Sequence, residues 1–267
     1  MQIFGVPLHR LEPDTFFTEI TAFQGQKKVF TPNPEMLLKA KDDTEFHDIL
    51  RAAEYLTIDG IGLYFGFQAL EYKSRFIRFL LTDWFFFNIL FRRKYLEKKY
   101  GKRICGSDLT RELIKYASKN NIRVAIIDPY FPHDLKKVEA QKTFREDLSG
   151  KYPDLKFDYY IYKDPQQVGE QIKGSEAKIL FSTLGMKSQE QSVIDIMQVC
   201  PNIKLGLGIG SSFDGLTGFQ KRCPDIVSKI GAEWLYRIIT TPRKLRQFQK
   251  IWRAVFVFSW EIIMWKG

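Results

Sequence analysis

The sequence predicts an α/β protein with a Rossmann-like, mostly parallel sheet that is flanked by helices. Three observations favour this class. Short apolar segments typical of strands alternate with helical segments, which is the order that parallel pairing requires. Polar or glycine-rich residues follow several of these segments, at the position where open α/β sheets bind ligands. The chain has 267 residues, of which 45% are hydrophobic, so it can bury one large core.

Two predicted strands near the beginning of the chain each end in a polar turn. Residues 1–25 are expected to form a short strand and a helix. The segment KKVF is a predicted strand that ends at the turn TPNP (31–34), whose second proline suits the first turn of the following helix. After a predicted helix over 45–53, the segment YLTI is a short buried strand that ends at Asp59 and Gly60.

The second half of the chain continues the alternation of helices and strands. A helix is expected from Ser107 to Asn120, with Ser107 or Asp108 as its N-cap. Four predicted strands follow, separated by helical spacers: NIRVAIIDP, KFDYYIY, AKILFSTLG and NIKLGLGIG. The last strand runs into a glycine-rich loop, GIGSSFDG, which begins at Gly208.

The C-terminal part of the chain differs from the alternating region. A helix over 225–240 is expected to end before a Thr-Pro pair that suits the start of a second helix. At 100° per residue, this second helix has apolar residues on one side and Arg and Lys on the other, which suits either a membrane surface or docking on the core. We predict an α/β core over 1–224 with an aromatic and basic insertion at about 71–100, and a helical, membrane-facing appendage over 225–267.

The composition limits the partners and the compartment. The formal charge of +10, from 41 Lys and Arg against 31 Asp and Glu, favours an anionic partner such as nucleic acid, anionic lipid or a phosphorylated substrate. The three cysteines lack C-x-x-C spacing, which predicts a reduced, cytosolic chain. The N-terminus lacks the pattern of a secretory signal, and the most apolar segment, 76–91, is too short and too charged for a transmembrane helix.

Several common motifs are absent from the sequence. There is no P-loop, no H-E-x-x-H and no Asp-x-Asp, and the three histidines are scattered along the chain. The chain therefore lacks the paired carboxylates that usually hold Mg²⁺ or Mn²⁺ on a nucleotide diphosphate, and we expect neither a metal nor a cofactor. A leaving diphosphate would then need fixed cations. Arg and Lys residues in the last fifth of the chain are candidates, although such a run also suits a solvated helix face.

Polar clusters that follow predicted strands are expected to meet at one edge of the sheet. Four such clusters occur: Thr31–Asn33, Asp59, Gly185–Glu190 and Gly206–Asp214. A single Asp at the end of a strand is often only the cap of a helix or a turn. Four polar strand ends in one chain favour a shared ligand site.

Six segments of the chain resemble motifs of one enzyme family. In order they are TPNPEMLLKA, DGIGL, KRICGSDL, LGMKSQE, GIGSSFDGLTGFQKRCP and GAEWLYRIITTPRK. Over about residues 25–247 the chain resembles the WecG/TagA/CpsF glycosyltransferase family. The resemblance implies transfer of N-acetylmannosamine, its uronic acid or glucose from a UDP-sugar donor to a polyprenyl-diphosphate-linked sugar acceptor. It also implies inversion without a metal, at the cytoplasmic membrane surface, in the synthesis of teichoic acids and other surface polysaccharides, and it suggests a homo-oligomer.

The resemblance assigns roles around the reacting hydroxyl. Asp59 in DGIGL matches the proposed base, which would take a proton from the acceptor. Thr31 and Asn33 match a T-x-N motif near the acceptor and the base. Arg103 in KRICG matches an arginine that is placed to handle phosphate.

The resemblance also assigns the donor site. Gln189 and Glu190 match a Gln-Glu pair that contacts the nucleotide or the sugar. The remaining residues belong to the glycine loop and to the segment that closes over the diphosphate, and they are Gly208, Gly210, Asp214, Arg222, Arg237 and Lys244. The glycines would let the backbone approach the nucleotide, and the charged residues would organise the loop and contact the diphosphate.

The chain departs from the family pattern at four places. Lys187 stands where the family usually has Pro, and IIDPYFPHD replaces a glycine-rich turn after the central strand. The family's P-x-R-x-x-R becomes PRKLRQ at 242–247, which keeps the charge in part and shifts it by one position, to Lys244. The insertion at 71–100 lies between the Asp-Gly motif at 59–60 and the Arg103 motif, which are separated by only a short segment in the family. We hypothesise that this insertion widens membrane contact or shapes a lipid groove, with additional core packing as the alternative.

Two other functional interpretations stay open. A basic module for nucleic acid would use the aromatic and cationic segments to stack on a strand and hold it. Because the polar clusters follow strand ends and no RNA-binding signature is present, we expect no nucleic-acid partner. A non-catalytic relative that binds the membrane or a sugar nucleotide is the second alternative. The altered IDPYFP turn keeps it open, whereas the retained residues argue against it: Asp59, Arg103, Gln189, Glu190 and Arg237.

Overall fold

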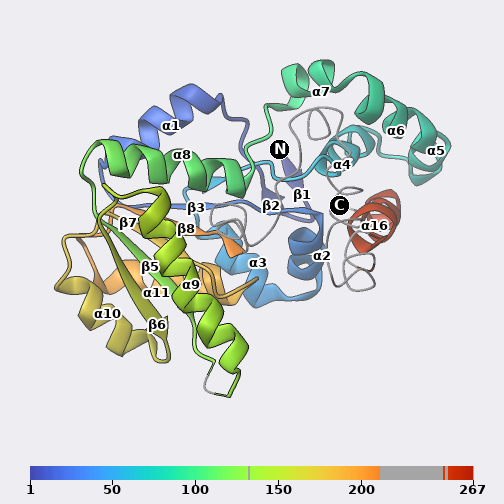
Figure 1. Ribbon diagram of the computed structural model, residues 1–267. Coiled ribbons are helices and arrows are strands. Elements are labelled where there is room, and N and C mark those ends of the chain that lie inside the picture. Colours follow the sequence, from blue (N-terminus) through green and yellow to red (C-terminus); the bar gives the residue numbers. More distant parts are fainter. Residues whose placement is uncertain (132, 211–248, 250–251, 267) are drawn as a thin grey trace.

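The computed structural model describes residues 1–131, 133–210, 249 and 252–266, which form a six-stranded parallel sheet covered by helices on both faces (Figure 1). The strand order is β4-β3-β8-β7-β5-β6, and all neighbours pair in parallel. The strands are β3 (Lys27–Phe30), β4 (Tyr55–Leu56), β5 (Val124–Pro129), β6 (Phe157–Tyr162), β7 (Ile179–Ser182) and β8 (Leu205–Gly208). The α/β class predicted from the sequence is confirmed.

The sheet is buried on both faces because successive strand residues point to opposite layers. Ala125 and Ile127 of β5 belong to one core cluster, whereas Val124 and Ile126 belong to the other. The first cluster includes residues of α2 (Pro34–Asp42), α3 (Thr44–Arg51), α10 (Pro165–Lys173) and α11 (Ser188–Val199). The second includes residues of α1 (Pro13–Thr21), α8 (Gly106–Lys119) and α9 (Leu135–Lys151).

Two predicted strands differ in detail from the structure. One short strand is predicted at the N-terminus, whereas β1 (Gln2–Ile3) and β2 (Val6–Pro7) form an antiparallel hairpin. Both residues of its turn have positive φ, 51° and 77°, which suits the tight turns of twisted hairpins. The strand that is predicted to end at Asp59 ends three residues earlier, at Leu56, and Asp59 lies in the loop that follows.

The predicted N-cap of α8 is wrong. The helix begins at Gly106, and Cys105 occupies the N-cap position without a side-chain hydrogen bond. Just before the helix, the Ile104 N–H donates a hydrogen bond to the Ile58 carbonyl oxygen at 3.1 Å. Asp108 lies in the first turn of the helix, where its negative charge interacts favourably with the helix dipole. Its Oδ1 atom lies 2.9 Å from Arg111 Nη2.

The predicted insertion at 71–100 folds into three short helices that extend to the right of the sheet in Figure 1. They are α5 (Arg75–Leu80), α6 (Thr82–Phe91) and α7 (Arg93–Tyr100), and α4 (Leu63–Leu70) precedes them. Near the C-terminus a π-helical segment, η2 (Arg253–Val257), leads into α16 (Phe258–Met264), which contacts α2, α4 and α5. We call α4 to α7 together with η2 and α16 the helical lobe.

The inner side of the helical lobe continues the main core. Phe258 and Ile262 of α16 are fully buried in the cluster that also contains Leu37 of α2 and Phe65 of α4. Of the appendage predicted over 225–267, the structure describes Gln249 and the residues from Trp252 to Lys266. Across the described residues of the whole chain, no helix combines the length and the apolar character needed to cross a membrane.

Candidate active site

The carboxyl ends of β3, β4, β7 and β8 form the edge at which the sequence predicts a ligand site. Phe30 at the end of β3 pairs with Leu56 of β4 and with Gly208 of β8. Ser182 at the end of β7 pairs with the same Gly208, so the loops that leave these strands start side by side. Eight of the predicted site residues lie in or beside these loops: Thr31, Asn33, Asp59, Arg103, Gln189, Glu190, Gly208 and Gly210.

The turn that contains Asn33 packs against the turn that follows Asp59. Asn33 is the N-cap of α2, and its Oδ1 accepts a hydrogen bond from the Met36 N–H at 3.0 Å. Asp59 is half-buried and precedes Gly60, which has a φ of +106°. A Cβ at Gly60 would lie 3.2 Å from Pro34 Cδ and 4.0 Å from Asn33 Cβ. Glycine is therefore required both for this turn and for its contact with the start of α2.

Arg103 precedes a residue that is hydrogen-bonded to the segment leading into Asp59. The Ile104 N–H donates to the Ile58 carbonyl oxygen at 3.1 Å. The buried Thr57 hydroxyl donates to the Ile104 carbonyl oxygen at 2.9 Å. Because these bonds join the residues adjacent to them, Arg103 and Asp59 emerge from neighbouring segments of the chain.

Gln189 and Glu190 pack against the end of β8. A Cβ at Gly208 would lie 3.0 Å from both Gln189 Cγ and Glu190 Oε1, so a larger residue would displace these side chains. Thr31, the first residue after β3, is buried beside this strand end because Phe30 pairs with Gly208. The structure thus brings the Gln-Glu pair, the glycine loop and the T-x-N turn to one edge.

Glu190 is fully buried and fixes the start of α11. Its carboxylate accepts hydrogen bonds from the Lys187 N–H at 2.7 Å and from Gln189 Nε2 at 2.5 Å. Burial raises the pKa of Glu190 to about 7, although both hydrogen bonds favour the charged form. The Lys187 ammonium in turn lies 2.7 Å from carboxylate oxygens of Asp43 and Glu45. These contacts hold the side chains of Glu190 and Gln189 in place at the start of α11.

The side-chain oxygen of Gln189 lacks a hydrogen-bond partner. Among the side-chain N and O atoms of the described residues, Gln189 Oε1 is buried and has no hydrogen-bond partner. It faces the glycine loop, since a Cβ at Gly210 would lie 3.3 Å from it. An unsatisfied buried polar atom costs about 1–3 kcal/mol, so such an atom in a native protein needs an explanation. A hydroxyl or N–H group of a ligand at the glycine loop would satisfy it.

Asp128 is a polar residue of the same edge that the predicted site lacks. It lies near the end of β5, and its carboxylate accepts hydrogen bonds from Gln141 Nε2 at 2.7 Å and from the hydroxyls of Tyr159 and Thr183. Burial, followed by the hydrogen bond to Asp128 and then by the Asp128 charge, raises the pKa of Tyr159. The sequence signal was the Asp within the altered IDPYFP turn. Asp128 thus links the end of β5 to α9, to the middle of β6 and to the residue that follows β7.

The remaining predicted site residues lie outside the described part of the chain. They are Asp214, Arg222, Arg237 and Lys244. The described beginning of the glycine loop ends at Gly210, which has a φ of +48°. Within the described ranges, no three His, Cys, Asp or Glu side chains are grouped closely enough to hold a metal ion.

The fold and this edge define an α/β protein that gathers polar groups at the carboxyl ends of parallel strands, where nucleotide-binding folds hold their ligands. Within this class, the sequence model of the Glycosyl transferase WecG/TagA/CpsF family matches residues 1–86 and 87–266. The chain belongs to this family, which confirms the resemblance carried by the six motifs. It is therefore a member of a glycosyltransferase family that acts in the synthesis of cell-surface polysaccharides.

Proposed function

We propose that this protein is an inverting glycosyltransferase that moves a sugar from a UDP-sugar to a polyprenyl-diphosphate-linked sugar without using a metal ion. The donor sugar is of the N-acetylmannosamine, N-acetylmannosaminuronic acid or glucose type. The product serves surface polysaccharide or teichoic acid synthesis at the inner face of the cell membrane. The observation that carries the proposal is the meeting of the Asp59 turn, the T-x-N turn and the Gln-Glu pair at one edge of the sheet.

Asp59 is the base of the proposed mechanism. Inversion in one displacement requires the acceptor hydroxyl to attack the anomeric carbon from the side opposite the departing UDP. The bond between the hydroxyl oxygen and the anomeric carbon forms while the bond to the diphosphate breaks, and the hydroxyl proton passes to the Asp59 carboxylate. The half-buried position of Asp59, directly before the glycine that packs against the start of α2, supports this role, because it limits the orientations of the side chain.

The donor nucleotide binds on the Gln189 side of the edge in this proposal. Gly208 and Gly210 allow a ligand to approach the backbone closely, and Gln189 Oε1 accepts a hydrogen bond from the nucleotide or the sugar. UDP leaves as an anion and needs fixed positive charge, which Arg103 and later cations supply. The later residues assigned to the donor are Asp214, which organises the loop, and Arg222, Arg237 and Lys244, which contact the diphosphate.

A second candidate is a non-catalytic member of the family that binds the membrane or a sugar nucleotide. The observation that favours it is the hydrogen bonding of Asp128, whose two carboxylate oxygens are both engaged by neighbouring side chains. This network occupies the end of β5, where the family usually has a glycine-rich turn. Nucleotide binding without turnover would distinguish this candidate from the enzyme.

The proposed reaction is tested by measuring UDP release from a panel of UDP-sugars with a short-chain lipid-diphosphate-linked N-acetylglucosamine acceptor. We expect release that depends on the acceptor, occurs with one donor class and survives EDTA. Release that EDTA abolishes would contradict the metal-free mechanism. If no donor supports release but calorimetry detects UDP binding, the non-catalytic candidate replaces the enzyme.

A further inference from the structure

The helical lobe carries a surface that is apolar although it faces solvent. Its outer side presents Phe76, Phe79, Leu80, Trp84, Leu90 and Phe91. Phe76 is 69% exposed and Phe91 is 72% exposed. Soluble proteins rarely expose contiguous apolar surface of this kind unless it binds something. We call these six side chains the aromatic face.

The aromatic face is held in place by buried polar contacts. Arg78, on the opposite side of α5, is only 6% exposed and donates hydrogen bonds to the carbonyl oxygens of Tyr72, Ile262 and Trp265 at 2.7–3.0 Å. These bonds fasten α5 to α16, which lies far away in the sequence. Because these hydrogen bonds fix the inner side of the lobe, the fold keeps the apolar side chains of the outer side exposed to solvent.

A second set of buried contacts orders α6. Asn88 Nδ2 donates to Gln68 Oε1 at 2.8 Å, and both side chains are buried between α4 and α6. Phe85 of α6 is also buried and packs edge-on against Phe65 of α4, with ring centroids 5.6 Å apart. The helix thus has a packed side and an exposed side, and the exposed side carries Trp84 and Phe91.

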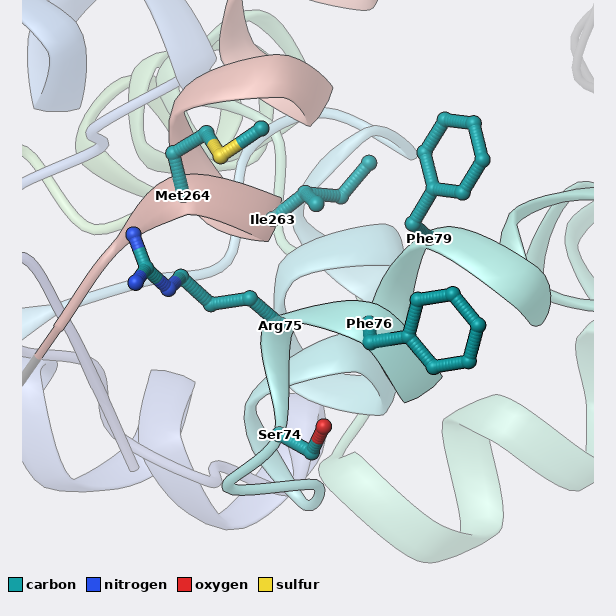
Figure 2. Close-up of a pocket in the computed structure, with 6 residues that line it drawn as sticks. All are labelled: Ser74, Arg75, Phe76, Phe79, Ile263 and Met264. Carbon is teal, nitrogen blue, oxygen red and sulfur yellow. The ribbon is translucent and has the colours of Figure 1, made fainter.

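A groove of about 490 Å³ opens between α5 and α16 and is continuous with the aromatic face (Figure 2). Its lining residues are Ser74, Arg75, Phe76, Phe79, Ile263 and Met264. In Figure 2 the Phe76 and Phe79 rings lie on one side, whereas the Arg75 guanidinium reaches toward Met264 on the other. The groove therefore combines apolar walls with one cationic group.

The surroundings of the aromatic face are basic. Residues 71–100 contain eight Lys and Arg against three Asp and Glu. The Arg92 guanidinium lies 5.7 Å from the ring centroid of Trp84 and 4.7 Å from that of Tyr95, and Lys73, Arg75 and Lys94 are exposed. Exposed Trp, Tyr and Phe side chains among cations are typical of segments that lie at the surface of an anionic membrane.

We propose that the aromatic face and the adjoining groove dock the protein on an anionic lipid bilayer, with the phenyl and indole rings inserted among the lipids and the cations against the headgroup phosphates. The alternative occupant, a second copy of this chain, is less suited to this surface. A twofold contact would place the same Lys and Arg residues against each other, and protein interfaces are depleted of Lys. The choice of a bilayer also rests on the lipid-linked acceptor of the proposed function.

One short helix connects the segment of the candidate base to the aromatic face. Asp59 lies before the start of α4 and α5 follows its end, and the eight residues of α4 span about 12 Å along the helix axis. The C-terminal segment also reaches this turn, since a Cβ at Gly62 would lie 3.5 Å from the Ala254 carbonyl oxygen. A lipid held at the aromatic face would therefore keep its diphosphate and sugar near the carboxyl edge of the sheet.

The proposal is tested by co-sedimentation with vesicles of phosphatidylcholine, with and without phosphatidylglycerol. The full chain is compared with the triple variant Phe76→Ser, Phe79→Ser and Phe91→Ser. The matched control is Leu135→Ser with Val138→Ser, which removes two exposed apolar side chains from α9, at a distance from the lobe in the sequence and the fold. The melting temperature of each variant shows that its fold is retained.

We expect the wild-type chain and the control to bind vesicles that contain phosphatidylglycerol, and the triple variant to bind them at least about ten-fold more weakly. Binding of the triple variant equal to that of the control would overturn the proposal. So would a shift of the triple variant from oligomer to monomer without any change in vesicle binding, because it would identify a second copy as the occupant. The assay contains neither donor nor acceptor, so its result is independent of sugar transfer.

Discussion

At the carboxyl edge of the sheet polar side chains are buried, whereas in the helical lobe apolar side chains are exposed. Glu190 and Gln189 are almost inaccessible, and one oxygen of Gln189 has no partner. Phe76 and Phe91 of the lobe are mostly accessible. Folding alone favours neither arrangement, because burial of polar groups and exposure of large apolar groups both cost free energy.

The two departures from ordinary burial indicate two different tasks. A buried and hydrogen-bonded polar group has a fixed position, which is what binding and displacement at a reacting carbon require. An exposed apolar group on an ordered helix can transfer into a lipid phase without unfolding the protein. The comparison therefore assigns the proposed chemistry to the edge and the proposed docking to the lobe.

The comparison of the edge with the lobe requires a rigid inner side of the lobe. The substitution Arg78→Met tests this rigidity. The substitution keeps the apolar stem but removes the donors to three carbonyl groups, which should lower the free energy of unfolding by about 3–5 kcal/mol. Urea unfolding measures this loss, and hydrogen exchange should show faster exchange in α16. Arg75→Met, on the exposed side of the same helix, is the control. Equal stability of both variants would show that the lobe is not held by Arg78.

The buried polar character of the edge is tested through the pH dependence of stability. Burial raises the pKa of Glu190 from 4.5 to about 7, so the folded state holds this proton more tightly than the unfolded chain. The resulting stabilisation is complete below pH 4.5 and is lost as the pH rises to about 7. Glu190→Gln stays neutral and should gain up to about 3 kcal/mol of stability relative to wild type over this range.

Urea unfolding at a series of pH values measures the Glu190 effect. The control is Glu139→Gln, which replaces an exposed glutamate on α9 and should follow the wild-type profile. If Glu190→Gln ran parallel to wild type from acid to neutral pH, the pKa of Glu190 would be the same in the folded and unfolded states, near 4.5. The edge would then be more polar and more accessible than the comparison requires.

The smallest predicted effect concerns the packing behind the edge. A Cβ at Gly206 would lie 2.6 Å from Val193 Cγ1 and 2.3 Å from Met197 Sδ, so Gly206→Ala should destabilise the fold by about 1–2 kcal/mol through overpacking. Gly150→Ala is the matched control, because a Cβ there meets nothing within 4 Å and a helical Gly-to-Ala change usually stabilises. Thermal unfolding of both variants checks the prediction. A stabilised Gly206→Ala protein would mean that α11 packs loosely on β8.

Much of the carboxyl edge could be predicted from the sequence because it follows from local signals. Strand-like segments, their polar ends and the six motifs were sufficient to predict the α/β sheet and to bring Asn33, Asp59 and Gln189 to one edge. The hydrogen bonds of Asp128 were not predictable in the same way, since its partners come from three separate segments. Only the strand order places those segments together.

The helical lobe could be predicted only in outline. Its aromatic and basic composition was visible, but the sequence does not show which aromatic rings point inward. Phe85 is buried and Phe87 is exposed because α6 packs on α4 through one side, a contact that depends on tertiary structure. Arg78 illustrates the same limit, since its carbonyl partners Ile262 and Trp265 lie at the other end of the chain.

The most direct test of the division between edge and lobe is the initial rate of UDP release with two acceptors, one short-chain and dissolved, the other long-chain and embedded in anionic vesicles. We predict that Asp59→Asn lowers the rate about 10²–10⁴-fold with both acceptors, as expected for loss of a general base. The aromatic-face triple variant should lose rate only with the vesicle acceptor. Wild-type rates for Asp59→Asn with the dissolved acceptor would contradict the account.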